Sequence, residues 1–282
     1  MSIRISKLLF LLWILPQQIL AQSSLEIVPG NKYTIHSDVL GETREYRVGL
    51  PDSYDSDSAS DRKYPLLLVL DGPSHFRYVS GMLSSMSANR NGSRRVPEMI
   101  VVGLASTNRE RDFTPDKIVT RRKNDSGGAD QFLEFVEDEL LPELQEKYRL
   151  SRYNILFGHS LGGLFAVHTY LQEESSFDAL LAIDPSFGTW DAEKMDEKIA
   201  AMSDGPFGRY LYIATANWGT RNIGNRDRHV RFFESLRKRN GSDRFRARLN
   251  YFEDENHQSI PLIAFYQGLT TLFREFNSQA GN

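Results

Sequence analysis

The chain has no cysteine among its 282 residues. Disulfides, a thiol nucleophile, a thiolate metal site and a lipid anchor on cysteine are therefore excluded from its chemistry. An excess of charge of one sign is also missing, because 34 Lys and Arg residues nearly balance 37 Asp and Glu residues, for a net charge of −3. This balance gives no electrostatic basis for binding nucleic acid, and we expect no such partner.

Long hydrophobic runs are confined to the start of the chain, and no later segment is apolar enough to span a membrane. The first residues carry positive charge at Arg4, an apolar core over residues 8–15 that is too short to cross a bilayer, and a small residue at Ala21. This is the form of a secretory signal peptide. We expect residues 1–21 to be removed on export to the periplasm or the extracellular medium. Residues 22–282 contain no repeat or low-complexity linker and suit one α/β domain.

The run from Asn154 to Leu164 is the most informative part of the sequence. A short apolar stretch over 154–157 suits a buried strand, Gly158-His159-Ser160-Leu161-Gly162 fits the pattern Gly-x-Ser-x-Gly, and an apolar, helix-compatible segment follows. This is the pattern of a nucleophile elbow, which forces strained backbone angles on its serine and leaves no room for side chains two residues to either side. We expect Ser160 to be a nucleophile and the N–H of Leu161 to point at a developing oxyanion.

Apolar runs of strand length alternate with segments of helical spacing along the rest of the chain. The expected strands are 64–70, 99–104, 154–157, 179–183, 209–214 and 246–252, the expected helices are 130–144, 163–172, 230–236 and 263–276, and residues 33–50 are expected to form an antiparallel pair. The helix over 230–236 is expected to begin near Asp227. This alternation predicts a mainly parallel sheet with helices on both faces. In such sheets the chemistry gathers at the carboxyl ends of the strands, where Ser160 lies.

A serine hydroxyl needs a base that accepts its proton, and His257 is the best candidate among six histidines. It follows the last expected strand, and the α/β-hydrolase chain order is serine, acid, histidine. His159 is expected to point away from Ser160. The other histidines are assigned lesser roles: a place near the first strands for His36, contact with substrate or a surface position for His75, and a packed or solvated position in a helix for His168 and His229.

Several ordered motifs show a resemblance to a known family. They are Leu70-Asp71-Gly72, the run from Arg109 to Pro115, Glu139-Leu140-Leu141-Pro142, the elbow, Asp184-Pro185-Ser186-Phe187, and the run from Glu255 to Pro261. With these motifs the chain resembles the putative-esterase group of α/β hydrolases, which includes esterase D, ferric-siderophore esterases, feruloyl esterases and mycolyl transferases. The resemblance implies an α/β-hydrolase fold and a serine esterase that forms an acyl-enzyme, with no metal or organic cofactor and a small-molecule ester as partner. The sequence has no long insertion that would form a large lid, so we expect none.

The sequence departs from this group at the second oxyanion donor. The group supplies a backbone N–H just past Asp-Gly, but that residue is Pro73 here, and proline has no N–H. We expect the N–H of Gly72 to take this place, with Ser74 as the other candidate. The loss of one such donor typically lowers the rate by about 10²–10³-fold.

The acid is the second departure, because residues 214–219 follow the expected strand without a carboxylate. Asp227 is one candidate, although it lies where a helix N-cap is expected. Asp184 at the end of the preceding strand and Glu255, two residues before His257, are others. A Ser–His dyad without an acid is the fourth possibility, because the acid orients the imidazole without taking its proton.

These observations favour an exported serine esterase that uses Ser160 and His257. Two other functions stay open: a non-catalytic relative that binds a ligand, and an acyltransferase that uses the same serine. Candidate substrates are a ferric siderophore, a feruloyl or acetyl ester of the plant wall, and an envelope lipid. Arg109 and Arg111 are candidates for binding an anionic substrate or, with stronger support, for an ion pair with Asp112. The oligomeric state is not predicted.

Overall fold

The structure is a computed structural model that describes residues 30–89, 94–118, 125–203, 208–219, 223–240 and 246–280. The expected signal peptide, residues 1–21, lies outside these ranges, so its removal stays a prediction.

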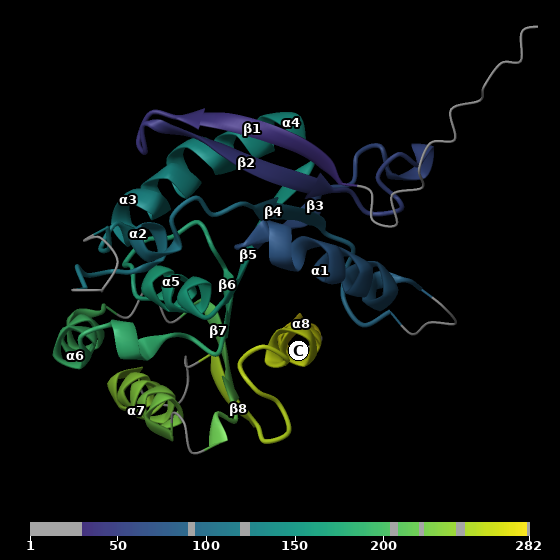
Figure 1. The fold of residues 1–282 in the computed structure, drawn as a ribbon. Helices are drawn as coiled ribbons and strands as arrows, with labels where there is room; N and C mark the ends of the chain where they lie inside the picture. The colour runs from purple at the N-terminus through teal and green to yellow at the C-terminus, as the bar shows by residue number, and fades with distance from the viewer. Residues whose placement is uncertain are drawn as a thin grey trace, which may run out of the picture.

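An eight-stranded sheet in the order β1-β2-β4-β3-β5-β6-β7-β8 organises the molecule (Figure 1). Its strands are β1 (Asn31–Ser37), β2 (Glu42–Gly49), β3 (Tyr64–Val69), β4 (Ile100–Leu104), β5 (Leu150–His159), β6 (Ala179–Ile183), β7 (Tyr210–Ala216) and β8 (Ala247–Phe252). β2 is antiparallel to both β1 and β4, and every other neighbouring pair is parallel. The predicted mainly parallel sheet and its antiparallel pair at one edge are confirmed.

Helices cover both faces of the sheet, as predicted. They are α1 (Gly72–Ser87), α2 (Arg109–Phe113), α3 (Ala129–Glu134), the π-helical turn Phe135–Leu140, α4 (Leu141–Lys147), α5 (Leu161–Tyr170), α6 (Ala192–Ala201), α7 (Ile223–Asn240) and α8 (Ile260–Ala280). α1 and α8 lie on one face and the remaining helices on the other (Figure 1). Two short 3₁₀ turns, Asp57–Ala59 and Phe187–Thr189, complete the described elements.

The two faces correspond to two apolar cores, which explains the continuous apolar strands. In β3, Leu66 and Leu68 belong to the core beneath α3 to α7, while Leu67 and Val69 belong to the core beneath α1 and α8. Successive side chains of a strand point to opposite faces, so a strand that is covered on both faces needs an apolar residue at every position. The carboxyl ends of β3, β5, β6, β7 and β8 consequently meet at one edge, where the loops carry the candidate site.

Some elements differ from the sequence-based expectation. α7 begins at Ile223, so Asp227 lies inside the helix on an exposed face and is not an N-cap. The first turns of α7 carry mostly polar residues, and the apolar periodicity from which the helix was predicted is weak there. The helix expected over 130–144 contains a π-helical turn just before Pro142, a proline that removes one backbone donor from the helical ladder.

A buried ion pair joins the antiparallel edge of the sheet to α2, which packs against the elbow helix α5. The guanidinium of Arg44 is fully buried and lies 2.8 Å from the carboxylate of Asp112, of which 1% is exposed. Asp112 also accepts a hydrogen bond of 2.8 Å from Arg111. A buried charge that loses its partner is strongly destabilising.

Asp112→Ala is therefore expected to lower the free energy of unfolding by about 1–3 kcal/mol, because it removes the buried carboxylate beside Arg44. The buried guanidinium then keeps only Glu42, which lies 2.6 Å away and is 30% exposed. Urea unfolding measures the change. The matched control is Asp116→Ala, which breaks the exposed ion pair of 3.0 Å with Lys194 and is expected to change stability by about 0–1 kcal/mol. Equal effects of the two substitutions would contradict this account of the buried pair.

Candidate active site

Ser160 occupies a strained turn between β5 and α5. Its backbone angles are φ 61° and ψ −117°, a conformation that non-glycine residues rarely adopt. A Cβ at Gly158 would lie 2.1 Å from the carbonyl oxygen of Gly162, and one at Gly163 would lie 2.9 Å from that of Ile183. Gly158 is therefore required, as predicted. Gly162 is not, because a Cβ there would lie 3.5 Å from its nearest neighbour; the second tight position is Gly163.

His257 lies next to this serine, although 97 positions separate them in the chain. The loop between β8 and α8 carries the imidazole to the carboxyl edge of the sheet. Its Nε2 lies 3.0 Å from Ser160 Oγ, within hydrogen-bonding distance. The structure thus brings together the two side chains that the sequence selected as nucleophile and base.

Asp184 is the carboxylate that contacts the histidine. Its Oδ2 lies 2.6 Å from His257 Nδ1, and its side chain is fully buried at the end of β6. Its φ of 43° places it among three described non-glycine residues with positive φ. Asp227 is exposed on α7, and the carboxylate that contacts His257 Nδ1 belongs to Asp184 rather than to Glu255. Of the possibilities that the sequence left open, the geometry selects Asp184.

Hydrogen-bond donors surround the Asp184 carboxylate. Besides His257, the N–H of Ala216 lies 3.1 Å from Oδ1 and the indole Nε1 of Trp218 lies 2.9 Å from Oδ2. Burial raises the pKa of Asp184, but the hydrogen bonds from His257 and Ala216 outweigh it, so the pKa lies below its ordinary value. The group is consequently a carboxylate at neutral pH and accepts the Nδ1 proton of His257.

Two aromatic rings pack against the His257 imidazole. The ring centroid of Trp218 lies 4.6 Å from that of His257, and the centroid of His159 lies 4.5 Å from it. Burial lowers the pKa of His159 to about 3, assisted by the nearby His257 and His75. His159 is therefore neutral at physiological pH. It packs against the His257 ring and limits its movement without placing a charge beside it.

His75 is buried rather than exposed, so a surface position for it is wrong. Its ring packs edge-on against Phe157 and His159, and its Nδ1 lies 3.1 Å from the hydroxyl of Tyr78. Burial lowers its pKa. His75 supports the face of β5 that carries His159. His168 and His229 are buried and hydrogen-bonded inside the fold, which agrees with a packed role.

The backbone donors near Ser160 narrow the candidates for an oxyanion site. Leu161 is the first residue of α5, so its N–H has no partner within the helix. Pro73 lies in the first turn of α1 and has no N–H, while the N–H of Ser74 donates to Asp71 O at 2.9 Å. Gly72 begins α1, and a Cβ there would lie 2.5 Å from the backbone of Gly103. The remaining candidate donors for an oxyanion are the backbone N–H groups of Leu161 and Gly72, each the first residue of its helix.

Arg109 fixes the loop that carries Gly72. Its Nε and Nη2 lie 2.8 and 3.0 Å from the two carboxylate oxygens of Asp71, and Nη2 also lies 3.4 Å from His159 O. Arg111 pairs with Asp112, as expected from the sequence. The pairing of Arg109 with Asp71 was not predicted, because the two residues lie 38 positions apart and no local pattern connects them.

Ser186 is a further neighbour of the nucleophile that sequence reasoning missed. Its Oγ lies 3.1 Å from Ser160 Oγ. It belongs to the Asp184-Pro185-Ser186-Phe187 motif, but the motif does not indicate which side chain turns toward the elbow. Only the parallel pairing of β5 with β6 places this loop beside Ser160.

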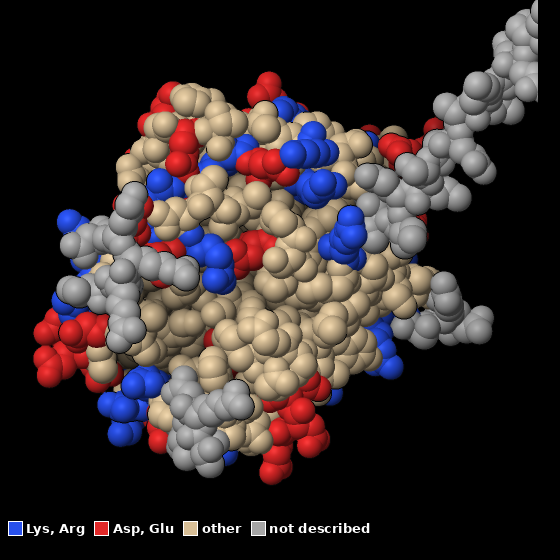
Figure 2. Space-filling view, in the orientation of Figure 1, with Lys and Arg blue, Asp and Glu red and all other residues tan. Residues whose placement is uncertain are grey.

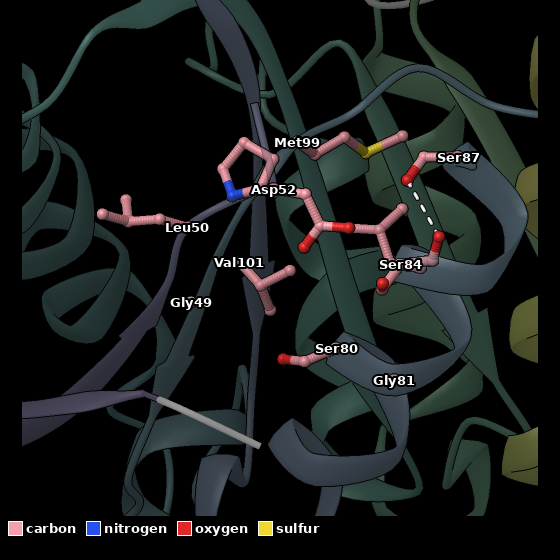
Figure 3. Close-up of a pocket in the computed structure, with 11 residues that line it drawn as sticks. Gly49, Leu50, Asp52, Ser80, Gly81, Ser84, Ser87, Met99 and Val101 are labelled. Atoms are coloured by element: carbon pink, nitrogen blue, oxygen red, sulfur yellow. Dashed lines mark hydrogen bonds between the residues drawn. The ribbon is translucent and has the colours of Figure 1, made fainter. Parts of the chain in front are cut away.

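The cavity in Figure 3 lies beside the start of β4, away from the carboxyl ends of the strands that carry the candidate site. It measures about 210 Å³ and is lined by residues that include Leu50, Ser80 and Met99. Met99 precedes the start of β4, whereas Ser160 follows the carboxyl end of β5. This cavity therefore does not contain the candidate catalytic groups.

The described surface and side chains add few constraints on ligands. Acidic and basic side chains are interspersed on the face in Figure 2. Within the described ranges, no three His, Asp or Glu side chains gather in a way that could hold a metal ion. No helix in the described part of the chain is long and apolar enough to cross a membrane.

Comparison with known proteins finds curated relatives of this chain. The chain is 29% identical over 174 residues to a ferri-bacillibactin esterase of Bacillus subtilis, and 33% identical over 150 residues to a siderophore enterobactin esterase of Emericella nidulans. These alignments cover 56% and 47% of this chain, and 59% and 49% of the relatives. This chain thus spans about half the length of these relatives.

Solved structures show the same architecture. The fold matches an IroE-like serine hydrolase from Shewanella oneidensis with a TM-score of 0.78 and 29% identity, over 88% of this chain and 81% of that one. The α/β-hydrolase fold predicted from the sequence is thereby confirmed. The family model described as putative esterase matches residues 37–222, which is more than half of the chain. The protein belongs to the putative-esterase family.

Proposed function

We propose that this protein is a serine esterase that hydrolyses carboxylic esters through an acyl-enzyme on Ser160. The observation that carries the proposal is the continuous contact from Ser160 Oγ to His257 Nε2, at 3.0 Å, and from His257 Nδ1 to Asp184, at 2.6 Å. A neutral imidazole whose Nδ1 proton is held by a carboxylate presents Nε2 as the acceptor for the serine proton.

Acylation begins when Ser160 Oγ attacks the ester carbonyl and its proton passes to His257 Nε2. The N–H groups of Leu161 and Gly72 hold the oxyanion of the tetrahedral intermediate. Collapse of the intermediate breaks the bond to the alcohol oxygen, which takes the proton from Nε2. In deacylation a water gives its proton to Nε2 and attacks the acyl carbon, and the proton then returns to Ser160 Oγ as the bond to the acyl group breaks.

The substrate that we propose is a siderophore ester. Of the two relatives named above, one is named a ferri-bacillibactin esterase and the other a siderophore enterobactin esterase. A feruloyl or acetyl ester of the plant wall and an envelope lipid are the alternatives. The completeness of the Ser160–His257–Asp184 contacts favours a catalyst over a relative that only binds a ligand.

Export of the protein is part of this proposal, with cleavage after residue 21. The support is the positive start, the short apolar core and the small residue at Ala21. Expression of the full chain in a bacterial host should yield a mature protein in the periplasm or medium that starts at Gln22. N-terminal sequencing checks this, and an intact Met1 in cytosolic protein would contradict it.

Ser160→Ala should reduce hydrolysis of p-nitrophenyl acetate and of enterobactin to background, because it removes the hydroxyl that contacts the base His257 at 3.0 Å. Labelling by a fluorophosphonate probe should be lost at the same time. Thermal unfolding followed by circular dichroism verifies that the variant is folded. Hydrolysis that survives in the folded variant would remove Ser160 from the mechanism. Equal rates toward enterobactin, feruloyl and acetyl esters in the wild type would contradict the substrate proposal alone.

Asp184→Asn should lower kcat by about 10³–10⁴-fold, because an amide leaves the imidazole in the wrong tautomer. Steady-state kinetics with p-nitrophenyl acetate measures the loss. Asp227→Asn is the matched control on the exposed face of α7 and should leave kcat unchanged. A large loss in Asp227→Asn, or full activity in Asp184→Asn, would contradict the assignment of the acid.

A further inference from the structure

The backbone of Ser186 is fixed beside the elbow independently of its side chain. Its N–H donates to the carbonyl oxygen of Ser160 at 3.1 Å. Its own carbonyl accepts hydrogen bonds from the N–H of Thr189 at 3.0 Å and from the hydroxyl of Thr189 at 2.7 Å. These bonds hold the short turn after β6 against the elbow. Removal of the Ser186 hydroxyl therefore leaves the backbone contacts intact.

The hydroxyl of Ser186 lies 3.1 Å from Ser160 Oγ, and the neighbouring groups determine which oxygen donates. Asp184 is ionised, so the proton of the His257 imidazole resides on Nδ1, which faces the carboxylate at 2.6 Å. Nε2 then has a free lone pair and accepts the single proton of Ser160 at 3.0 Å. Ser160 has no second proton to give. Ser186 is consequently the donor and Ser160 Oγ the acceptor.

We propose that Ser186 is a further catalytic residue, whose hydroxyl donates a hydrogen bond to the nucleophilic oxygen and stabilises the negative charge that develops there. The proposal rests on the proposed function, because it assigns a second hydroxyl to the same reaction. Ser186 keeps its proton throughout. The proton of Ser160 moves to His257 Nε2 and on to the leaving alcohol, and the proton of water returns through Nε2 to Ser160 Oγ.

This role predicts an effect on both chemical steps. Ser160 Oγ gains negative charge when it attacks in acylation and again when it departs in deacylation. A donor aimed at this oxygen stabilises both transition states relative to their ground states. A residue that only binds the leaving alcohol would affect acylation alone, and a residue that only binds substrate would change KM.

Stopped-flow kinetics with p-nitrophenyl acetate separates the two steps through the burst and the steady-state rate. Ser186→Ala should lower the acylation and the deacylation rate constants each by about ten- to a hundredfold, the range for a hydrogen bond to a charged group. Ser186→Thr keeps a hydroxyl at the same carbon and should recover most of both rates. Circular dichroism melting should show that both variants fold as the wild type does.

The proposal would be overturned by rates in Ser186→Ala within about threefold of the wild type, by a change in only one of the two steps, or by a change in KM alone. A loss that Ser186→Thr does not recover would also overturn it. If the wild type shows no hydrolysis that is lost in Ser160→Ala, both this proposal and the esterase function are overturned. Hydrolysis that depends on Ser160 but is insensitive to Ser186→Ala would overturn the role of Ser186 only.

Discussion

The hydrogen bond between His257 and Asp184 is the interaction on which the candidate site depends. It sets the imidazole tautomer, and the tautomer decides that Nε2 faces Ser160 as an acceptor. The carboxylate is buried and ionised, and further hydrogen bonds from Ala216 and Trp218 hold it in position for His257. The same bond orients the contact between Ser160 and Ser186, because it leaves the nucleophile with no proton for its neighbour.

The candidate acid, Asp184, lies after β6. The family resemblance had led us to expect it after β7. The loop after β7 has no carboxylate and provides the indole of Trp218 instead, which donates to Asp184 and packs on the His257 ring. β6 lies between β5 and β7 in the sheet, so its carboxyl end is beside the elbow and within reach of the loop that carries His257. A carboxylate at the end of β6 can therefore reach the His257 imidazole, just as a carboxylate at the end of β7 could.

The fold, Ser160 and His257 could be predicted from the sequence because each leaves a local pattern. Continuous apolar strands reveal a sheet that is covered on both faces, the Gly-x-Ser-x-Gly run requires a tight turn, and His257 follows the last strand. Asp184 could be proposed but not selected, because its contact with His257 joins residues 73 positions apart. Ser186 and the Arg109–Asp71 pair could not be predicted for the same reason, because only strand order and loop direction bring them to the site. Helices α1, α2 and α6 were not predicted from the sequence.

The most direct test of this account is the protonation of the His257 ring in solution, measured by ¹⁵N nuclear magnetic resonance at neutral pH with the protein labelled at histidine. The account predicts that the neutral form of the ring carries its proton on Nδ1 and a free lone pair on Nε2, and that Asp184→Asn loses this tautomer preference. A proton on Nε2 in the wild type, or no change on substitution of Asp184, would contradict it.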